Sequence, residues 1–206
     1  MKNEHCGQES RQLIIAAVGD SLTAGFGVDP SASYPSLLER KLRADGILCR
    51  LINAGVNGEK SGELLARIED ILSWEPDIVI LQTGTNDGLR NVPPLEMKEN
   101  IRKAVRSFKD RGITVLLAGM KNLRSRKGDF DGIFAGAYPE IAREEDVILV
   151  PFFLEGVAGV AELNRADGIH PTEEGYRIVV ENVFPCVLKA IEKARLAASS
   201  HPYRGM

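Results

Sequence analysis

Short apolar segments recur along the chain, separated by longer stretches in which apolar positions repeat with the period of a helix. The apolar segments are residues 13–18, 48–52, 77–81, 113–118 and 147–150. Runs of this length are typical of strands that are buried on both faces of a parallel sheet. Helices are expected over residues 35–44, 62–72, about 97–111, 131–143, and from near 172 toward 198. The alternation predicts an α/β fold, a three-layer α/β/α sandwich with five parallel strands.

Local signals refine these helices. Ser61 is a candidate cap for the second helix, and Pro185 is expected to bend or break the last one. In the third helix, Ile101, Val105 and Phe108 share one face, which we expect to pack on the sheet.

Length and charge limit the class of protein. The chain has 206 residues, 44% of them apolar, which is enough for one substantial core. No repeat or linker divides it, so we expect a single domain over residues 1–206, with a core over about 13–196 and polar tails. A net charge of −3 argues against nucleic acid as a partner, because phosphate binding requires a strongly basic surface.

The same sequence bears on where the protein acts. Residues 1–11 lack the apolar segment of a signal peptide, and nowhere do 18 apolar residues run together. The odd number and wide spacing of Cys6, Cys49 and Cys186 suit reduced thiols. We therefore expect a cytoplasmic protein without a membrane segment, although a chain trimmed of an export leader would look the same.

One histidine stands out as a candidate for chemistry. His5 and His201 lie in the polar ends, which leaves His170, with Asp167 three residues before it. Ser21 lies in the segment Gly19-Asp20-Ser21-Leu22, which directly follows the first predicted strand. A serine nucleophile, a histidine base and a carboxylate that orients the base are the components of acyl-transfer catalysis. On these residues alone, Ser21 is either a nucleophile or part of a helix cap.

Asp20 and Asp167 have different expected roles. Asp20 is adjacent to Ser21 and points away from it, so we expect it to stabilise the loop. Asp167 can accept a hydrogen bond from Nδ1 of His170 and leave Nε2 for the serine proton. The Asp167–His170 pair could also be an ion pair or part of a metal site. No second internal histidine or CxxC motif completes such a site, so no metal and no cofactor are expected.

Two further loops are candidates for binding an oxyanion. Residues 53–58 follow the second predicted strand, and a glycine there lets a carbonyl oxygen approach a backbone N–H. Residues 84–87 follow the third strand, where the Asn86 amide could donate to the same oxygen. Taken alone, each loop is an ordinary turn. All these elements fall on one edge of the predicted sheet, which favours a shared site.

Four motifs, in chain order, resemble the four blocks of the SGNH (GDSL) hydrolase family: Gly19-Asp20-Ser21-Leu22, Gly55, Gly84-Thr85-Asn86-Asp87 and Asp167-Gly168-Ile169-His170-Pro171. The resemblance extends over about residues 14–191. Residues 84–89, 138–139 and 150–155 are similar to the bacterial arylesterase, acyl-CoA thioesterase and lysophospholipase subgroup. The resemblance implies a flavodoxin-like sheet of order 2-1-3-4-5. It also implies that Ser21 is the nucleophile, that Asp167 and His170 complete a triad, and that the oxyanion hole consists of the Ser21 and Gly55 N–H groups with the Asn86 amide.

The chain departs from this subgroup at residues 120–129, where relatives tend to have a proline-containing Asn-Tyr-Gly loop. In the subgroup that loop borders the acyl or leaving-group pocket. Met120, Arg124 and Arg126 are therefore candidate substrate-binding residues, together with Asp20 and Asp87. The cations of this loop could attract an anionic leaving group or could form an ordinary solvated surface.

These observations predict a cofactor-free serine hydrolase that cleaves small carboxylic esters or thioesters through an acyl-serine. Its expected partner is a small acyl ester, an acyl-CoA or a lysophospholipid, and its oligomeric state is open. A carbohydrate or other O-acetyl esterase is an alternative enzyme. A non-catalytic, nucleotide-binding flavodoxin-like module is an alternative of another class, but the first loop lacks the spaced glycines of a phosphate cradle.

Overall fold

The computed structural model describes residues 11–123 and 130–200, and within them five parallel strands form one sheet of order β2-β1-β3-β4-β5. The strands are β1 (Leu13–Gly19), β2 (Cys49–Gly55), β3 (Ile78–Gln82), β4 (Thr114–Ala118) and β5 (Ile148–Val150). The predicted fold class and strand order are confirmed. Among the strands, the predicted and observed bounds differ most for β2. It continues beyond the predicted end at Ile52 to Gly55, which pairs with Gly19 at the end of β1.

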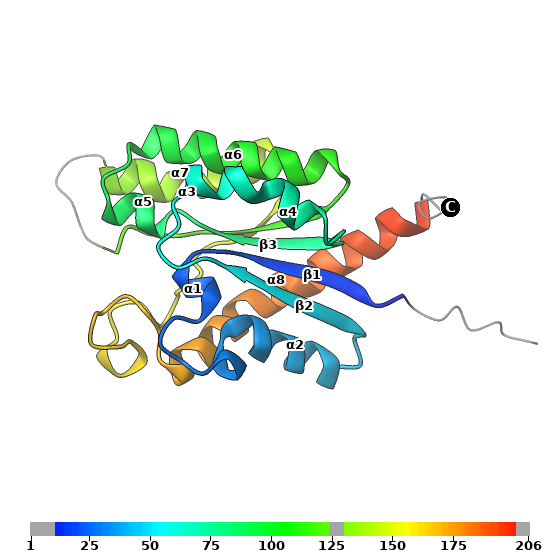
Figure 1. Cartoon of the computed structure of the whole chain (residues 1–206), viewed down its shortest axis with the longest axis horizontal. Helices are drawn as coiled ribbons and strands as arrows, with labels where there is room; N and C mark the ends of the chain where they lie inside the picture. The colour runs from blue at the N-terminus through cyan, green and yellow to red at the C-terminus, as the bar shows by residue number, and fades with distance from the viewer. Residues whose placement is uncertain (1–10, 124–129, 201–206) are drawn as a thin grey trace, which may run out of the picture.

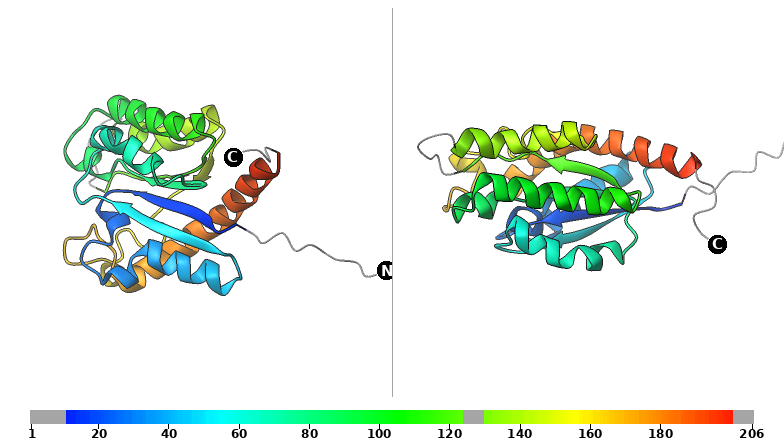
Figure 2. Two further views of the ribbon diagram at one scale, coloured as in Figure 1. Left: turned by 45° about the vertical axis from the view of Figure 1, so that its right-hand side comes forward. Right: turned by 90° about the horizontal axis from the view of Figure 1, so that it is seen from above.

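Helices cover both faces of the sheet (Figures 1 and 2). The helices are α1 (Ser21–Ala24), α2 (Tyr34–Ala44), α3 (Ser61–Leu64), α4 (Ile68–Leu72), α5 (Thr85–Leu89), α6 (Pro94–Asp110), α7 (Phe130–Glu144) and α8 (Glu173–Ser200). Short 3-10 turns are η1 (Pro30–Ala32), η2 (Leu65–Arg67) and η3 (Ala161–Leu163). Helices α2 and α8 lie on one face, and α6 and α7, with α3 to α5 beside them, lie on the other.

The core lies between these layers. Strands β3 and β4 are buried along their whole length, as expected for central strands with helices on both faces. Ile101, Val105 and Phe108 of α6 are fully buried, which confirms the predicted apolar face of this helix. Within the described residues, no helix has both the length and the apolar character that a membrane crossing requires.

Two predicted helices differ from expectation. The predicted helix over 62–72 is divided into α3, η2 and α4, and Ser61 is its first residue rather than its cap. Ser61 begins the helix because its N–H and hydroxyl both donate to the buried carboxylate of Asp87. The predicted break at Pro185 is absent from α8, where the buried side chains of Val183 and Val187 on either side of the proline continue the apolar face.

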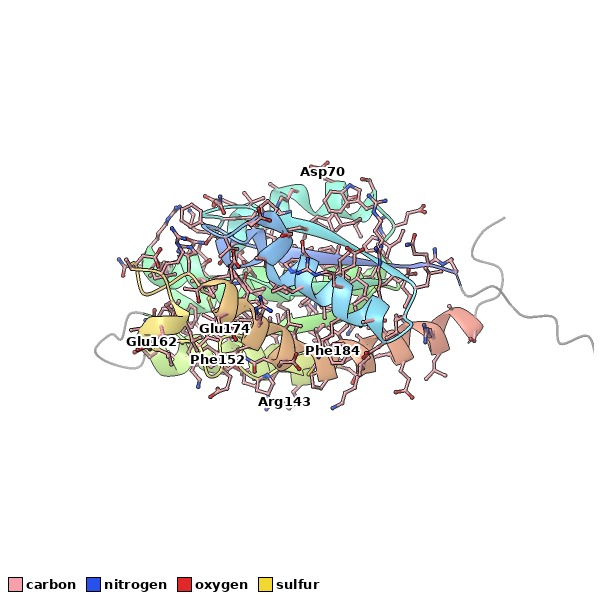
Figure 3. The ribbon with its side chains drawn as sticks, turned by 90° about the horizontal axis from the view of Figure 1, so that it is seen from below. Asp70, Arg143, Phe152, Glu162, Glu174 and Phe184 are labelled. Carbon is pink, nitrogen blue, oxygen red and sulfur yellow. The ribbon has the colours of Figure 1, made fainter. Side chains whose placement is uncertain are left out.

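The carboxyl ends of the strands meet at one edge of the sheet. Helix α1 follows β1, helix α5 follows β3, and the segment leading into α8 returns to the same end of the molecule (Figure 1). Figure 3 shows Phe152 and Glu162 at this end, near the start of α8 that Glu174 marks. The fold therefore brings together loops that are far apart in sequence.

Candidate active site

Ser21, His170 and Asp167 form an unbroken chain of contacts at this edge. Ser21 Oγ lies 2.8 Å from His170 Nε2, and His170 Nδ1 lies 2.8 Å from Asp167 Oδ2. Ser21 begins α1, separated from the end of β1 only by Asp20, which places its hydroxyl at the carboxyl edge of the sheet. The structure thus brings together the three residues that the sequence predicted as nucleophile, base and orienting carboxylate.

The Asp167 carboxylate is held by a local turn. Its Oδ1 accepts the backbone N–H groups of Ile169 and His170 at 2.9 and 3.0 Å, and Gly168 has the positive φ of 69° that this turn requires. Partial burial alone would raise the pKa of Asp167, but hydrogen bonds from the His170 backbone and ring and from Ile169 outweigh it and lower the pKa to about 2. An ionised Asp167 accepts from Nδ1–H, which leaves the lone pair on Nε2 facing Ser21.

Asp20 is fully enclosed behind the serine. Its carboxylate caps α1 by accepting the Leu22 N–H at 2.9 Å. Burial raises the pKa of Asp20 to about 6, and hydrogen bonds from Leu22, Thr85 and Gln82 oppose that rise. The predicted role in stabilising the loop agrees with this placement.

Three of the predicted substrate-binding residues do not reach the open part of the site. Asp20 and Asp87 are 0% and 1% exposed, and Asp87 is occupied by Ser61. Met120 is 1% exposed and belongs to the hydrophobic core, because its side chain packs inward from the end of β4. We revise these three assignments to structural roles. Arg124 and Arg126 lie outside the described residues.

A cleft of about 210 Å³ opens beside Ser21 and His170. More of its exposed lining is apolar than polar, and the Phe26 ring in this lining lies 4.8 Å from the His170 ring. The lining residues are Ser21, Phe26, Asn57, Gly58, Thr85, Asn86, Leu89, Ile169 and His170.

Gly55 does not line this cleft. Its N–H donates to Asn53 Oδ1 at 3.0 Å, so it is already occupied. A Cβ at Gly55 would come within 2.1 Å of the Ala24 backbone nitrogen, which shows that this glycine allows β2 to pack against α1. The assignment of Gly55 as an oxyanion donor is therefore corrected.

Gly58 occupies the place that Gly55 was expected to have. It lines the cleft, and its positive φ of 78° turns the loop after β2 toward Ser21. Among residues 11–123 and 130–200, neither Gly58 nor Ser21 has an acceptor for its backbone N–H. The Asn57-Gly58 dipeptide, a strong turn signal, could have identified this residue from the sequence.

Asn86 also lies where it was predicted. Its Nδ2 donates to the Glu59 carbonyl oxygen at 3.0 Å and lies 3.4 Å from Asp20 Oδ2. The first contact holds one amide hydrogen firmly, whereas the second is long enough to leave the other available to a ligand. The Asn86 amide and the Gly58 N–H therefore border the same cleft.

A second pocket of about 370 Å³ adjoins the cleft and shares Ile169 with it. Lys121 lies on its rim, with Nζ 4.3 Å from the centre of the Phe152 ring and 3.8 Å from a Glu155 carboxylate oxygen. The other lining residues are Asn122, Leu123, Phe152, Leu154, Ala158, Gly159, Asn164 and Gly168. The described part of the chain contains no group of three or more His, Cys, Asp or Glu residues that could hold a metal ion.

A serine–histidine–aspartate chain beside an apolar cleft, at the carboxyl edge of a parallel sheet, is the arrangement of a serine hydrolase. The model of the GDSL-like lipase/acylhydrolase family matches residues 17–178. The chain belongs to this family.

Named relatives agree with that membership. Esterase TesA of Pseudomonas aeruginosa is 35% identical over 179 residues, which cover 86% of this chain and 89% of that protein. Thioesterase 1/protease 1/lysophospholipase L1 of Escherichia coli K12 is 31% identical over 168 residues, which cover 81% and 79%. A crystal structure of TesA matches with a TM-score of 0.82 over 86% of this chain and 99% of that one. The predicted SGNH membership and ester hydrolase activity are thus confirmed.

Proposed function

We propose that Ser21 is the nucleophile of a two-step ester or thioester hydrolase, with His170 as general base and Asp167 as the carboxylate that orients it. The observation that carries this proposal is the pair of 2.8 Å contacts that join the three side chains. An ionised Asp167 that accepts from Nδ1–H would leave Nε2 of His170 to accept the Ser21 proton, which supports these roles.

In the first step, His170 Nε2 takes the hydroxyl proton of Ser21 while Oγ attacks the carbonyl carbon of the substrate. The resulting oxyanion accepts hydrogen bonds from the N–H groups of Ser21 and Gly58 and from the Asn86 amide. His170 then returns its proton to the leaving alcohol or thiol as the bond to the carbonyl carbon breaks. In the second step, His170 takes a proton from water while the water oxygen attacks the acyl carbon. His170 then donates this proton to Ser21 Oγ as the acyl–oxygen bond breaks, which releases the acid and restores Ser21 and neutral His170.

The substrate class follows from the lining of the two pockets. Phe26, Leu89 and Ile169 offer apolar surface beside the nucleophile, which suits aryl or short to medium alkyl groups. The group on the opposite side of the ester bond can bind in the adjoining pocket. An arylesterase of Vibrio mimicus, 34% identical over 177 residues, and the thioesterase of E. coli support aryl esters and acyl thioesters as substrates.

The test combines covalent labelling with a substrate panel. A fluorophosphonate probe should label the wild-type protein at Ser21 and fail to label Ser21→Ala, because only an activated serine reacts. Turnover should be measured on p-nitrophenyl esters from acetate to palmitate, on acyl-CoA and on acetylated sugars. Ser21→Ala should lose nearly all turnover without a change in melting temperature. More than a tenth of wild-type kcat in that variant would rule out this nucleophile.

A further inference from the structure

A largely buried ion pair adjoins the proposed oxyanion donors. Arg67 donates from Nε and Nη2 to the two carboxylate oxygens of Glu59 at 2.5 and 2.7 Å. The side chains are 19% and 4% exposed, so the pair is well shielded from water. Two parallel donor–acceptor contacts of this kind fix the relative orientation of both groups.

The pair connects the three loops that form the site. Glu59 follows Gly58, and its backbone carbonyl holds the Asn86 amide at 3.0 Å. Arg67 Nη2 also reaches the Gly19 carbonyl oxygen at 3.4 Å, two residues before Ser21. The same Gly19 oxygen accepts the Val56 N–H at 2.9 Å at the start of the glycine turn.

The local backbone places Arg67 for this contact. The helix predicted over 62–72 is interrupted at η2, and Arg67 has φ −114° and ψ 12°, outside helical geometry. Neither Glu59 nor Arg67 lines the cleft, so neither contacts a substrate there. A buried ion pair is by itself weak support for stability, since desolvation offsets much of its attraction.

We propose that Glu59 and Arg67 are positioning residues, whose ion pair holds the turn at 56–59 so that the Gly58 N–H and the Asn86 amide face the developing oxyanion. This inference rests on the proposed function. Oxyanion donors act mainly in the transition state, so their displacement lowers kcat and changes KM little.

The experiment compares Arg67→Met with a matched control, Arg102→Met. Arg102 has a similarly shielded side chain, 17% exposed, and donates to Glu99 and Glu144 at 2.9 and 2.7 Å, but no residue of α6 lines the cleft. Measurements are kcat and KM on p-nitrophenyl butyrate, the rate of fluorophosphonate labelling, and the melting temperature. Arg67→Lys, which keeps the charge but not the paired donors, should restore part of the lost rate.

Arg67→Met should lower kcat about tenfold to a hundredfold and slow labelling in parallel, with KM within about twofold of wild type. Arg102→Met should leave all three kinetic values unchanged, even where it lowers the melting temperature. Glu59→Gln keeps the side-chain volume and should lower kcat in the same direction, which provides a test should Arg67→Met fail to fold.

The inference is overturned if Arg67→Met and Glu59→Gln keep wild-type kcat, or if their loss appears in KM alone. It is also overturned if Arg102→Met loses as much kcat as Arg67→Met. These results differ from a failure of the proposed function, in which Ser21→Ala itself remains active.

Discussion

Asn86→Ala tests the oxyanion site most directly. Asn86 is 9% exposed, and its amide is held 3.0 Å from the Glu59 carbonyl oxygen, so the side chain is already oriented before substrate binds. Removing one such preoriented donor typically lowers kcat about a hundredfold or more, which corresponds to about 3 kcal/mol of barrier. Because the donor acts in the transition state, KM should stay close to that of wild type.

The same substitution has a separate effect on stability. It leaves the Glu59 carbonyl without its donor in a site where that residue is 5% exposed, at a cost of about 1–3 kcal/mol. At roughly 2–4 °C per kcal/mol for a domain of this size, the melting temperature should fall by several degrees while the protein remains folded at 25 °C.

Asn86→Asp sharpens the test because it keeps the shape and changes only the chemistry. The new carboxylate would lie 3.4 Å from Asp20 Oδ2, and two charges at that distance repel by about 5 kcal/mol at an effective dielectric of about 20. This variant should therefore be less stable than Asn86→Ala at pH 8, with a smaller difference at pH 5. The assay is initial rate on p-nitrophenyl butyrate with thermal melts at both pH values. A kcat within about threefold of wild type for Asn86→Ala would refute Asn86 as an oxyanion donor.

Three further predictions concern burial and charge. Hydrogen bonds outweigh partial burial and lower the pKa of Asp167 from 3.8 to about 2. The ionised carboxylate therefore stabilises the fold fully above pH 3.8, and this contribution is lost as the pH falls through about 2. In urea melts, the free energy of unfolding of Asp167→Asn should depend less on pH in this range than that of wild type, and parallel curves for the two proteins would contradict this. Burial raises the pKa of Asp20 to about 6, so its ionisation destabilises the fold as the pH rises above 3.8. The free energy of unfolding of Asp20→Asn should therefore increase relative to that of wild type between pH 4 and 8. A difference that stays constant over this range would contradict the prediction. Gly55→Ala would place a Cβ 2.1 Å from the Ala24 backbone nitrogen and should destabilise the fold by about 3 kcal/mol or more. The control is Gly46→Ala, which has open space around the new Cβ and a φ of 77° and should cost about 1 kcal/mol. Equal melting temperatures for the two variants would refute the packing role of Gly55.

The centre of the sheet was predictable because β1, β3 and β4 are apolar on both faces, so each is a continuous run in the sequence. The Asp167–His170 pair was predictable for another reason: both residues lie in one turn, and a separation of three residues fixes their contact. The Glu59–Arg67 pair gave no such signal. It depends on an interrupted helix, and helical periodicity does not report an interruption that preserves the apolar face.

The sequence pattern also did not predict which single polar residues near the site are buried. Asp20 and Asp87 stand next to the candidate site residues Ser21 and Asn86, and proximity in sequence suggested that they could contact substrate. At the start of α1 and α5, however, adjacent side chains diverge around the helix axis, and Asp20 and Asp87 are the ones that face the interior. Both carboxylates are enclosed and hold the loops that carry their neighbours. A sequence pattern locates the edge of the sheet, but it does not show whether each side chain there faces the interior or the cleft.

The misplaced oxyanion glycine follows from the end of one strand. The apolar run of the second strand stops at Ile52, so residues 53–58 were predicted to be a loop, and the family resemblance was matched to Gly55 within it. Strand β2 lies at the sheet edge, where polar residues are tolerated, and it remains paired with β1 through Gly55. The true turn therefore begins at Val56, and the glycine at its tip is Gly58. An error at a strand end moved the expected donor by one glycine, from a position packed against α1 to one that lines the cleft.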